Sequence, residues 1–284
     1  MAFRDILLVL NTYPNPTPVS VIEHAVKFAD AVGAKISAIA CEVQVEVPSR
    51  FNFLSNLLID VPGLAAAELQ KSVDSAQVLL RAFETTAQKA GNYQETIPQR
   101  STTADMPNVL VEYGRMRDLT IMPVHDDDQI DQWAAETVIF ESGRPTLILP
   151  LDPARMRPGP LNTVVVAWDF SRPAARAIWD ALPILEKAKT VRVITIPDEK
   201  RIDSSRSAED LARYLARHGI EVMLEQVHAW GRTIGETVES YVTAHHADLL
   251  VMGAYGHSRV RQVILGGATK GLLSRPPLPI FFSH

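Results

Sequence analysis

The chain has 284 residues, of which 46% are hydrophobic and 21% are charged. This length predicts two domains, and this composition is typical of a soluble globular protein and excludes a disordered one. A single cysteine, Cys41, excludes an intrachain disulfide framework and zinc sites built on pairs of cysteines. No apolar run reaches the ~20 residues of a membrane helix, and the first residues carry no secretion signal. The sequence therefore predicts a cytoplasmic protein that does not associate with membranes.

The formal net charge of −5 is unevenly divided between the two halves. Residues 1–157 carry 13 basic and 20 acidic side chains, whereas residues 158–284 carry 15 basic and 13 acidic ones. Neither half has the excess positive charge that is typical of nucleic-acid-binding domains, so no nucleic-acid partner is predicted. The second half is the better suited of the two to an anionic ligand.

A linker is predicted at Leu151–Pro160, where three prolines and one glycine interrupt regular structure. After this linker, the pattern of the first half begins again. Asp5–Asn11 and Thr163–Asp169 are both apolar runs closed by a polar residue, and both are typical of a strand buried on both faces. The repeat predicts a duplicated domain, with one copy in residues 1–150 and the other in residues 161–284.

The later elements of the two copies also correspond. Helices are predicted at 19–32 and 173–187, followed by strands at 35–41 and 190–196; Asp118–Pro123 parallels Asp248–Gly253, and the last strands are Thr146–Leu149 and Ile280–Ser283. Further helices are predicted at 64–90, at 207–218 with a capping box from Ser207 to Asp210, and at 232–246. Strands that alternate with helices predict an α/β fold with a parallel sheet covered on both faces. Glu42–Gly63 has no counterpart of equal length and is interpreted as an inserted lid or contact segment.

The glycines near the end of the chain carry the clearest chemical signal. A buried strand is followed by Gly253-x-x-Gly256, and nine residues later by Gly266, Gly267 and Thr269 at the start of an apolar helix. Glycines allow the backbone to turn and to approach a bulky ligand, and free N–H groups beside a helix N-terminus form a phosphate cradle. Neither the dinucleotide fingerprint nor a Walker loop is present.

This strand and loop, with Ala247–Gly253 before the loop and the early strand that ends in Asp169–Ser171, resemble the universal stress protein family. The resemblance covers nearly the whole second half, and the first half resembles a diverged copy, so the chain looks like a tandem member. It implies two doubly wound domains, each a five-stranded parallel sheet with helices on both faces, of the adenine nucleotide alpha hydrolase-like type. It also implies a site for ATP, with or without Mg²⁺, and no permanent metal.

The resemblance assigns roles to individual positions. Asp169 matches the acid near the ribose and phosphates, and would meet a metal only indirectly, through nucleotide-bound Mg²⁺. Thr195 and Ile196 match the backbone site for adenine. The phosphate loop and the residues beside it correspond to Met252, Gly253, Gly256, His257, Gly266, Gly267 and Thr269.

Departures from the family pattern distinguish the two halves. The family usually has Ser or Thr where this chain has Gly267, and Thr269 is the candidate substitute; Phe170 also replaces a commoner glycine. In the first half, Pro123 stands where Gly253 stands in the second, and Asp126–Asp128 follow it. Proline removes an N–H donor, and three carboxylates repel phosphate. The sequence therefore predicts that only the second half binds nucleotide.

Several of these residues have a second interpretation. Asp169 is either a ligand-binding acid or a helix N-cap. Asp126–Asp128 are interpreted as a solvated turn rather than a metal site, and His245 and His246 point too far apart to share a metal.

Cys41 is interpreted as buried and inert. Phosphate contacts and a solvated basic face are both open for Arg259, Arg261 and Lys270, and core or interface packing is expected for Trp133, Trp168, Trp179 and Trp230.

The sequence favours a nucleotide-binding regulatory protein of the bacterial stress response that is not an enzyme, because no nucleophile–base pair or loop lysine is found. A slow ATP hydrolase and a purely structural interaction module are the alternatives. The apolar, uncharged last strands of the two halves predict that these strands pair within the chain as a pseudo-dimer. A further homodimer contact is suggested through Phe51–Ile59.

Overall fold

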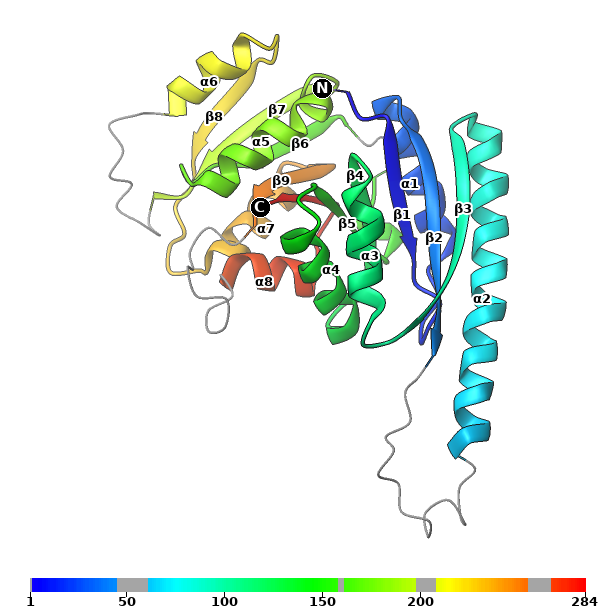
Figure 1. The fold of residues 1–284 in the computed structure, drawn as a ribbon. Coiled ribbons are helices and arrows are strands. Elements are labelled where there is room, and N and C mark those ends of the chain that lie inside the picture. The colour runs from blue at the N-terminus through cyan, green and yellow to red at the C-terminus, as the bar shows by residue number, and fades with distance from the viewer. Residues whose placement is uncertain (1, 45–60, 158–160, 198–207, 255–266) are drawn as a thin grey trace.

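The computed structural model describes residues 2–44, 61–157, 161–197, 208–254 and 267–284 (Figure 1). The first half contains β1 (Asp5–Leu10), α1 (Val19–Val32), β2 (Lys35–Gln44), α2 (Val61–Ala90), β3 (Tyr93–Thr102), α3 (Met106–Arg115), β4 (Leu119–Val124), α4 (Gln129–Glu141) and β5 (Thr146–Pro150), and η1 (Pro153–Arg155) follows in the predicted linker. The second half contains β6 (Thr163–Ala167), α5 (Arg172–Leu185), β7 (Thr190–Thr195), α6 (Ala208–Ala216), β8 (Val222–Gln226), α7 (Ile234–Ala244), β9 (Leu249–Gly253), α8 (Gly267–Ser274) and β10 (Ile280–Ser283).

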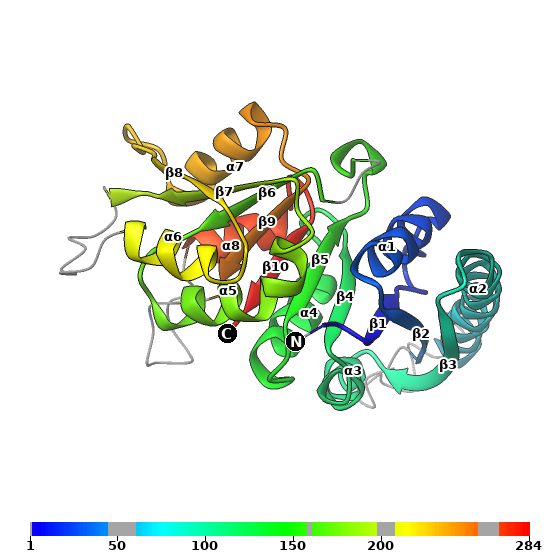
Figure 2. The ribbon, with the colours of Figure 1, turned by 90° about the horizontal axis from the view of Figure 1, so that it is seen from above.

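The strands of both halves form one sheet in the order β3-β2-β1-β4-β5-β10-β9-β6-β7-β8, as Figure 2 shows. Within each half all strand pairs are parallel, which confirms the α/β fold with two five-stranded parallel sheets. The halves join where β5 and β10 pair in antiparallel orientation, with Ile148 opposite Ile280 and Leu147 opposite Phe281. The prediction that the two last strands pair within the chain is therefore confirmed.

The hydrophobic core continues across this seam on both faces of the sheet. One cluster of buried residues lies under α1, α2, α5 and α6, and the other lies under α3, α4, α7 and α8. Phe281 belongs to the first cluster and Phe282 to the second, because neighbouring residues of a strand point to opposite faces. Both phenylalanines are fully buried, so separation of the halves would expose both sides of β10 to water.

An aspartate repeated in both halves ties the starts of adjacent strands together. In the first half, Asp118 Oδ2 accepts hydrogen bonds from the backbone N–H groups of Arg4 and Asp5, at 2.8 and 3.1 Å. In the second half, Asp248 Oδ2 accepts from Asn162 N and Thr163 N, at 2.9 and 2.8 Å. These acids lie at the amino ends of the strands, opposite the expected ligand edge, so their repetition reflects folding rather than binding.

The helix ends match the sequence analysis in part. Gly33 follows the last residue of α1 in the left-handed conformation, with φ of 76°, which glycine adopts without strain, and the helix ends at residue 32 as predicted. The described capping box lies at the start of α7, where Thr233 and Glu236 bond to each other's backbone N–H, and the sequence analysis did not identify it. The predicted box from Ser207 and the segment Phe51–Ile59 lie outside the described residues. Among the helices described, none combines the length and apolar composition of a membrane span.

Candidate functional site

Three of the residues predicted to bind nucleotide, Asp169, Thr195 and Gly253, lie at the carboxyl edge of the sheet. β6 lies between β7 and β9, with Ala167 opposite Met252, and Trp168 N donates to Ile194 O at 2.9 Å. Asp169 follows directly, and Thr195 and Gly253 end the neighbouring strands. This edge, where the strand order reverses in each half, is the place at which open α/β sheets bind ligands.

Asp169 stabilises the turn between β6 and α5. Its Oδ1 accepts a hydrogen bond from Ser171 N at 3.0 Å, and Ser171 in turn caps α5 by accepting from Ala174 N at 3.2 Å. The interpretation of Asp169 as the helix N-cap is therefore wrong, because Ser171 takes that role. Phe170, between them, has a φ of 60° and lies 5.3 Å from the Trp168 ring. The family's commoner glycine suits this left-handed position, which this chain fills with an aromatic residue.

Gly253 has a packing role that the sequence analysis did not identify. A Cβ atom there would lie 2.4 Å from Ala174 N and 2.5 Å from Pro173 C, both of them backbone atoms of α5. The missing side chain thus allows the N-terminus of α5 to rest on the end of β9. Met252 is 8% exposed and belongs to the core on the α7–α8 face, so its side chain is mainly a packing group.

The helix after the glycine loop begins with small residues. A Cβ at Gly267, the first residue of α8, would have no described neighbour within 4 Å, and Thr269 is buried in the first turn. α7 packs against this turn, where a Cβ on Gly235 would lie 3.7 Å from Ala268. Lys270 is exposed. The remaining predicted loop residues, Gly256, His257, Gly266, Arg259 and Arg261, lie outside the described residues.

The corresponding edge of the first half is occupied by one of its own carboxylates. Asp131 Oδ2, on α4, accepts a hydrogen bond from Asn11 Nδ2 at 3.1 Å and from His125 N at 3.0 Å. His125 Nδ1 lies 2.7 Å from the same oxygen and donates to it, because an ionised carboxylate only accepts. Asn11 Nδ2 also reaches Pro123 O at 3.2 Å. Asn11 and Pro123 are the counterparts of Asp169 and Gly253 in the second half. The hydrogen-bond donors at this edge are therefore already bonded to the Asp131 carboxylate.

Comparison with known proteins agrees with this architecture. Residues 160–283 match the model of the universal stress protein family. The second half of the chain therefore belongs to this family. A universal stress protein from Archaeoglobus fulgidus has a TM-score of 0.71 at 19% identity, covering 98% of this chain and 95% of that one. A protein of unknown function from Pseudomonas aeruginosa PAO1 has a TM-score of 0.59 at 16% identity, covering 99% and 92%.

These two structures extend over both halves, so the chain has the fold of a tandem universal stress protein. At such identities the likeness concerns the fold alone. A comparison with curated proteins found no match.

Asp126 and Asp127 connect the first half to the linker and to the second half. The Asp126 carboxylate receives two hydrogen bonds of 2.8 Å from the guanidinium group of Arg155 in the linker. Asp127, with a φ of 57°, donates its N–H to Ser274 O at the end of α8 and accepts from Ser274 Oγ at 2.7 Å. Asp128 caps α4. Asp126 and Asp127 are exposed and lie in a turn, which agrees with the interpretation as a solvated turn, but the contacts of this turn with the linker and with α8 were not predicted. No group of potential metal ligands occurs among the described residues.

The remaining residues singled out in the sequence have local roles. Burial raises the pKa of the Cys41 thiol to about 11, which keeps it in the unreactive protonated form. His245 stacks on Tyr241 with ring centroids 4.0 Å apart, whereas His246 Nδ1 lies 3.0 Å from Arg157 Nη2, so the two histidines have different partners. Of the two expectations for the tryptophans, core packing is wrong for three whose relative exposure is 46%, 50% and 85%, and interface packing stays a prediction for them: Trp133, Trp179 and Trp230.

Proposed function

We propose that this universal stress protein is a regulatory protein of the bacterial stress response, acting in the cytoplasm, that binds adenine nucleotide at the carboxyl edge of its second half only. The ligand is ATP, with or without Mg²⁺. Binding of nucleotide would set the state of a surface that other proteins contact. The chain supplies a fixed site for the nucleotide, and no residue is assigned to its hydrolysis.

The observation that carries this proposal is the contrast between the two edges. In the first half, three donor groups of Asn11 and His125 converge on Asp131 Oδ2. A phosphate brought there would compete with this internal carboxylate and would be repelled by it. In the second half, Asp169 and Gly253 lie at the carboxyl ends of the paired strands β6 and β9, and α8 begins with a residue that has no side chain.

The residues of the second half fit an adenine nucleotide. By resemblance to the family, the backbone of Thr195 and Ile196 would bind adenine and Asp169 would lie near the ribose and phosphates. The N-terminus of α8 offers backbone N–H groups and the positive end of the helix dipole to phosphate oxygens. Among the described residues, no atom would lie within 4 Å of a Cβ on Gly267, so none of them blocks the approach of a phosphate to this backbone. Nucleotide-bound Mg²⁺ would meet Asp169 only through the phosphates.

Calorimetric titration of the full chain with ATP tests the proposal, with substitutions at corresponding positions of the two halves. Asp169→Ala should weaken ATP binding about tenfold, equivalent to about 1.4 kcal/mol. Asn11→Ala, the matched control, should leave the affinity unchanged. Failure of the unmodified chain to bind ATP, or a larger effect of Asn11→Ala, would overturn the assignment. Phosphate release measured in the same samples distinguishes a binding protein from a slow hydrolase.

A further inference from the structure

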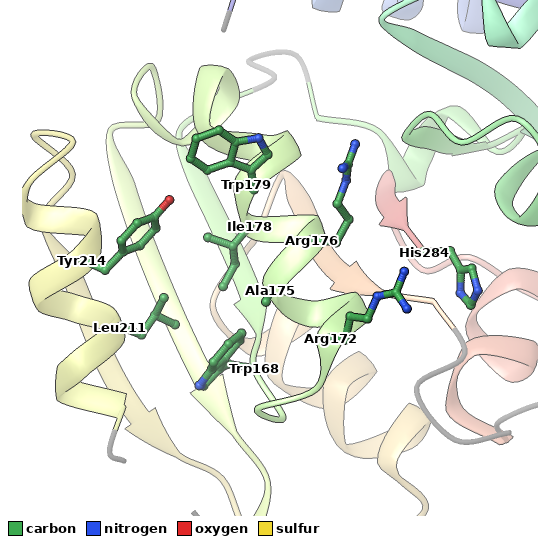
Figure 3. Close-up of a pocket in the computed structure, with 9 residues that line it drawn as sticks. All are labelled: Trp168, Arg172, Ala175, Arg176, Ile178, Trp179, Leu211, Tyr214 and His284. Atoms are coloured by element: carbon green, nitrogen blue, oxygen red, sulfur yellow. The ribbon is translucent and has the colours of Figure 1, made fainter. Parts of the chain in front are cut away.

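A hollow of about 590 Å³ lies on the outward side of α5, and we call it the α5 hollow. Figure 3 shows that it has two unlike sides, with the small side chain of Ala175 between them. On the side of α6 lie the rings of Trp168, Trp179 and Tyr214, and toward His284 lie the guanidinium groups of Arg172 and Arg176. None of the described residues predicted to bind nucleotide lines this hollow.

The hollow exists because the two halves cover their first helix differently. In the first half, α2 is 30 residues long and packs along α1. In the second half, α6 has 9 residues and packs on β8 rather than on α5. The outer face of α5 is therefore left with a half-exposed Trp179 beside the exposed Ala175. Exposed aromatic rings that line one hollow are more informative than single exposed apolar residues, because contiguous apolar patches mark binding sites.

The aromatic side of the hollow is held in place by ring contacts. His218, in the turn after α6, lies 4.9 Å from the Tyr214 ring and 6.5 Å from the Trp179 ring, edge-on to both. The Trp168 ring packs against Phe170, in the turn before α5, with the two ring planes tilted by 51°. The Trp168 indole Nε1 is buried and has no hydrogen-bond partner among the described residues. These ring contacts thus hold the aromatic walls of the hollow in place, and the indole N–H of Trp168 has no described acceptor.

The basic side of the hollow contains two arginines, of which one has an ion-pair partner among the described residues and the other has none. Arg176 forms an ion pair with Asp180 at 2.7 Å, whereas no described carboxylate pairs with Arg172. Arg172 is the first residue of α5, directly after the Ser171 cap. A positive charge there opposes the helix dipole and so does not stabilise α5. Its position is explained if it meets an anionic group from outside the chain.

We propose that the α5 hollow binds a small planar aromatic carboxylate. The ring lies against Trp179 and Tyr214, the molecule crosses α5 at Ala175, and the carboxylate meets the guanidinium fork of Arg172. A single unpaired guanidinium suits one carboxylate, which it binds through two parallel hydrogen bonds. The volume of the hollow lies within the range of small-molecule sites. This site is separate from the proposed nucleotide site, and its existence does not depend on nucleotide binding.

Naphthalene-2-carboxylate is the probe that tests this site, titrated calorimetrically into the full chain. The unmodified chain should bind one molecule, and should bind the neutral naphthalene-2-carboxamide about tenfold more weakly because the amide lacks the charge. Arg172→Glu should weaken carboxylate binding at least about tenfold while preserving α5, since a glutamate is favourable at a helix N-terminus. Ala175→Leu should block the crossing point, and leucine is a good helix former.

A matched control places the same change elsewhere. Ala66→Leu, at an exposed position of α2, should leave probe binding unchanged. Circular dichroism and thermal unfolding establish that each variant is folded. The proposal is overturned if the unmodified chain does not bind the probe, or if folded Arg172→Glu and Ala175→Leu variants bind it as the unmodified chain does. Displacement of the probe by ATP would equally contradict a separate site.

Discussion

Replacing Gly253 with alanine should destabilise the protein, although the change adds a single methyl group. The new Cβ would lie 2.4 Å from Ala174 N and 2.5 Å from Pro173 C. Ordinary contact distances are ~3.5 Å or more, so the backbone of α5 would have to move by about 1 Å. Overpacking costs about 1–3 kcal/mol, and we expect a value near 3 kcal/mol because backbone atoms cannot rotate away as a side chain would.

Thermal unfolding followed by circular dichroism measures this effect. For a chain of this size, a loss of about 3 kcal/mol lowers Tm by roughly 6–12 °C. Gly267→Ala is the matched control, since its Cβ meets no described atom within 4 Å and it begins a helix. That variant should keep its free energy of unfolding within about 0.5 kcal/mol of the original value. If the two variants unfold at the same temperature, the packing explanation for Gly253 is wrong.

Three other predictions follow from single side chains. Gly267→Ser restores the hydroxyl that is usual in the family, at a position where a Cβ would meet no described atom. Calorimetry should show that ATP binds about tenfold more tightly, which is the effect of one hydrogen bond to a charged group. An unchanged affinity would contradict the proposed position of the phosphates. Burial lowers the pKa of His24 to about 4, so below pH 6.5 the unfolded chain binds a proton that the folded chain does not. Stability should fall by up to about 3 kcal/mol between pH 6.5 and 4, and urea unfolding of His24→Gln should show a weaker fall. Phe281→Asp places a carboxylate at the fully buried seam and should separate or aggregate the halves. The control Phe281→Leu should remain one compact particle in small-angle scattering. A compact Phe281→Asp variant would contradict the role of the seam.

The sequence predicted the repeat and the seam because both are written in short, continuous patterns. Apolar runs closed by Asn11 and Asp169 mark buried strands whose ends share one edge of a sheet. The last strands, Thr146–Leu149 and Ile280–Ser283, carry no charge and therefore need a partner. These features depend on the types of residue in short continuous segments, so the sequence alone is enough to predict them.

The features that the sequence did not predict depend on contacts between distant residues. Asp131 meets Asn11 across 120 positions, and Gly253 meets Ala174 only because α5 begins against the end of β9. The connection from Asp127 to Ser274 spans 147 positions, so the exposed acidic turn gives no sign of it in the sequence. The exposure of Trp179 follows from the shortness of α6, whose packing no local pattern reveals.

The number of ATP molecules bound by one full-length chain is the measurement that most directly tests the proposed division of function between the halves. Equilibrium dialysis with labelled ATP at saturating concentration gives this number without any variant. The contrast between the Asp131-occupied edge and the Asp169 edge predicts one molecule per chain. Two molecules per chain would show that the first half also binds nucleotide, and none would show that neither edge does; either result contradicts the account.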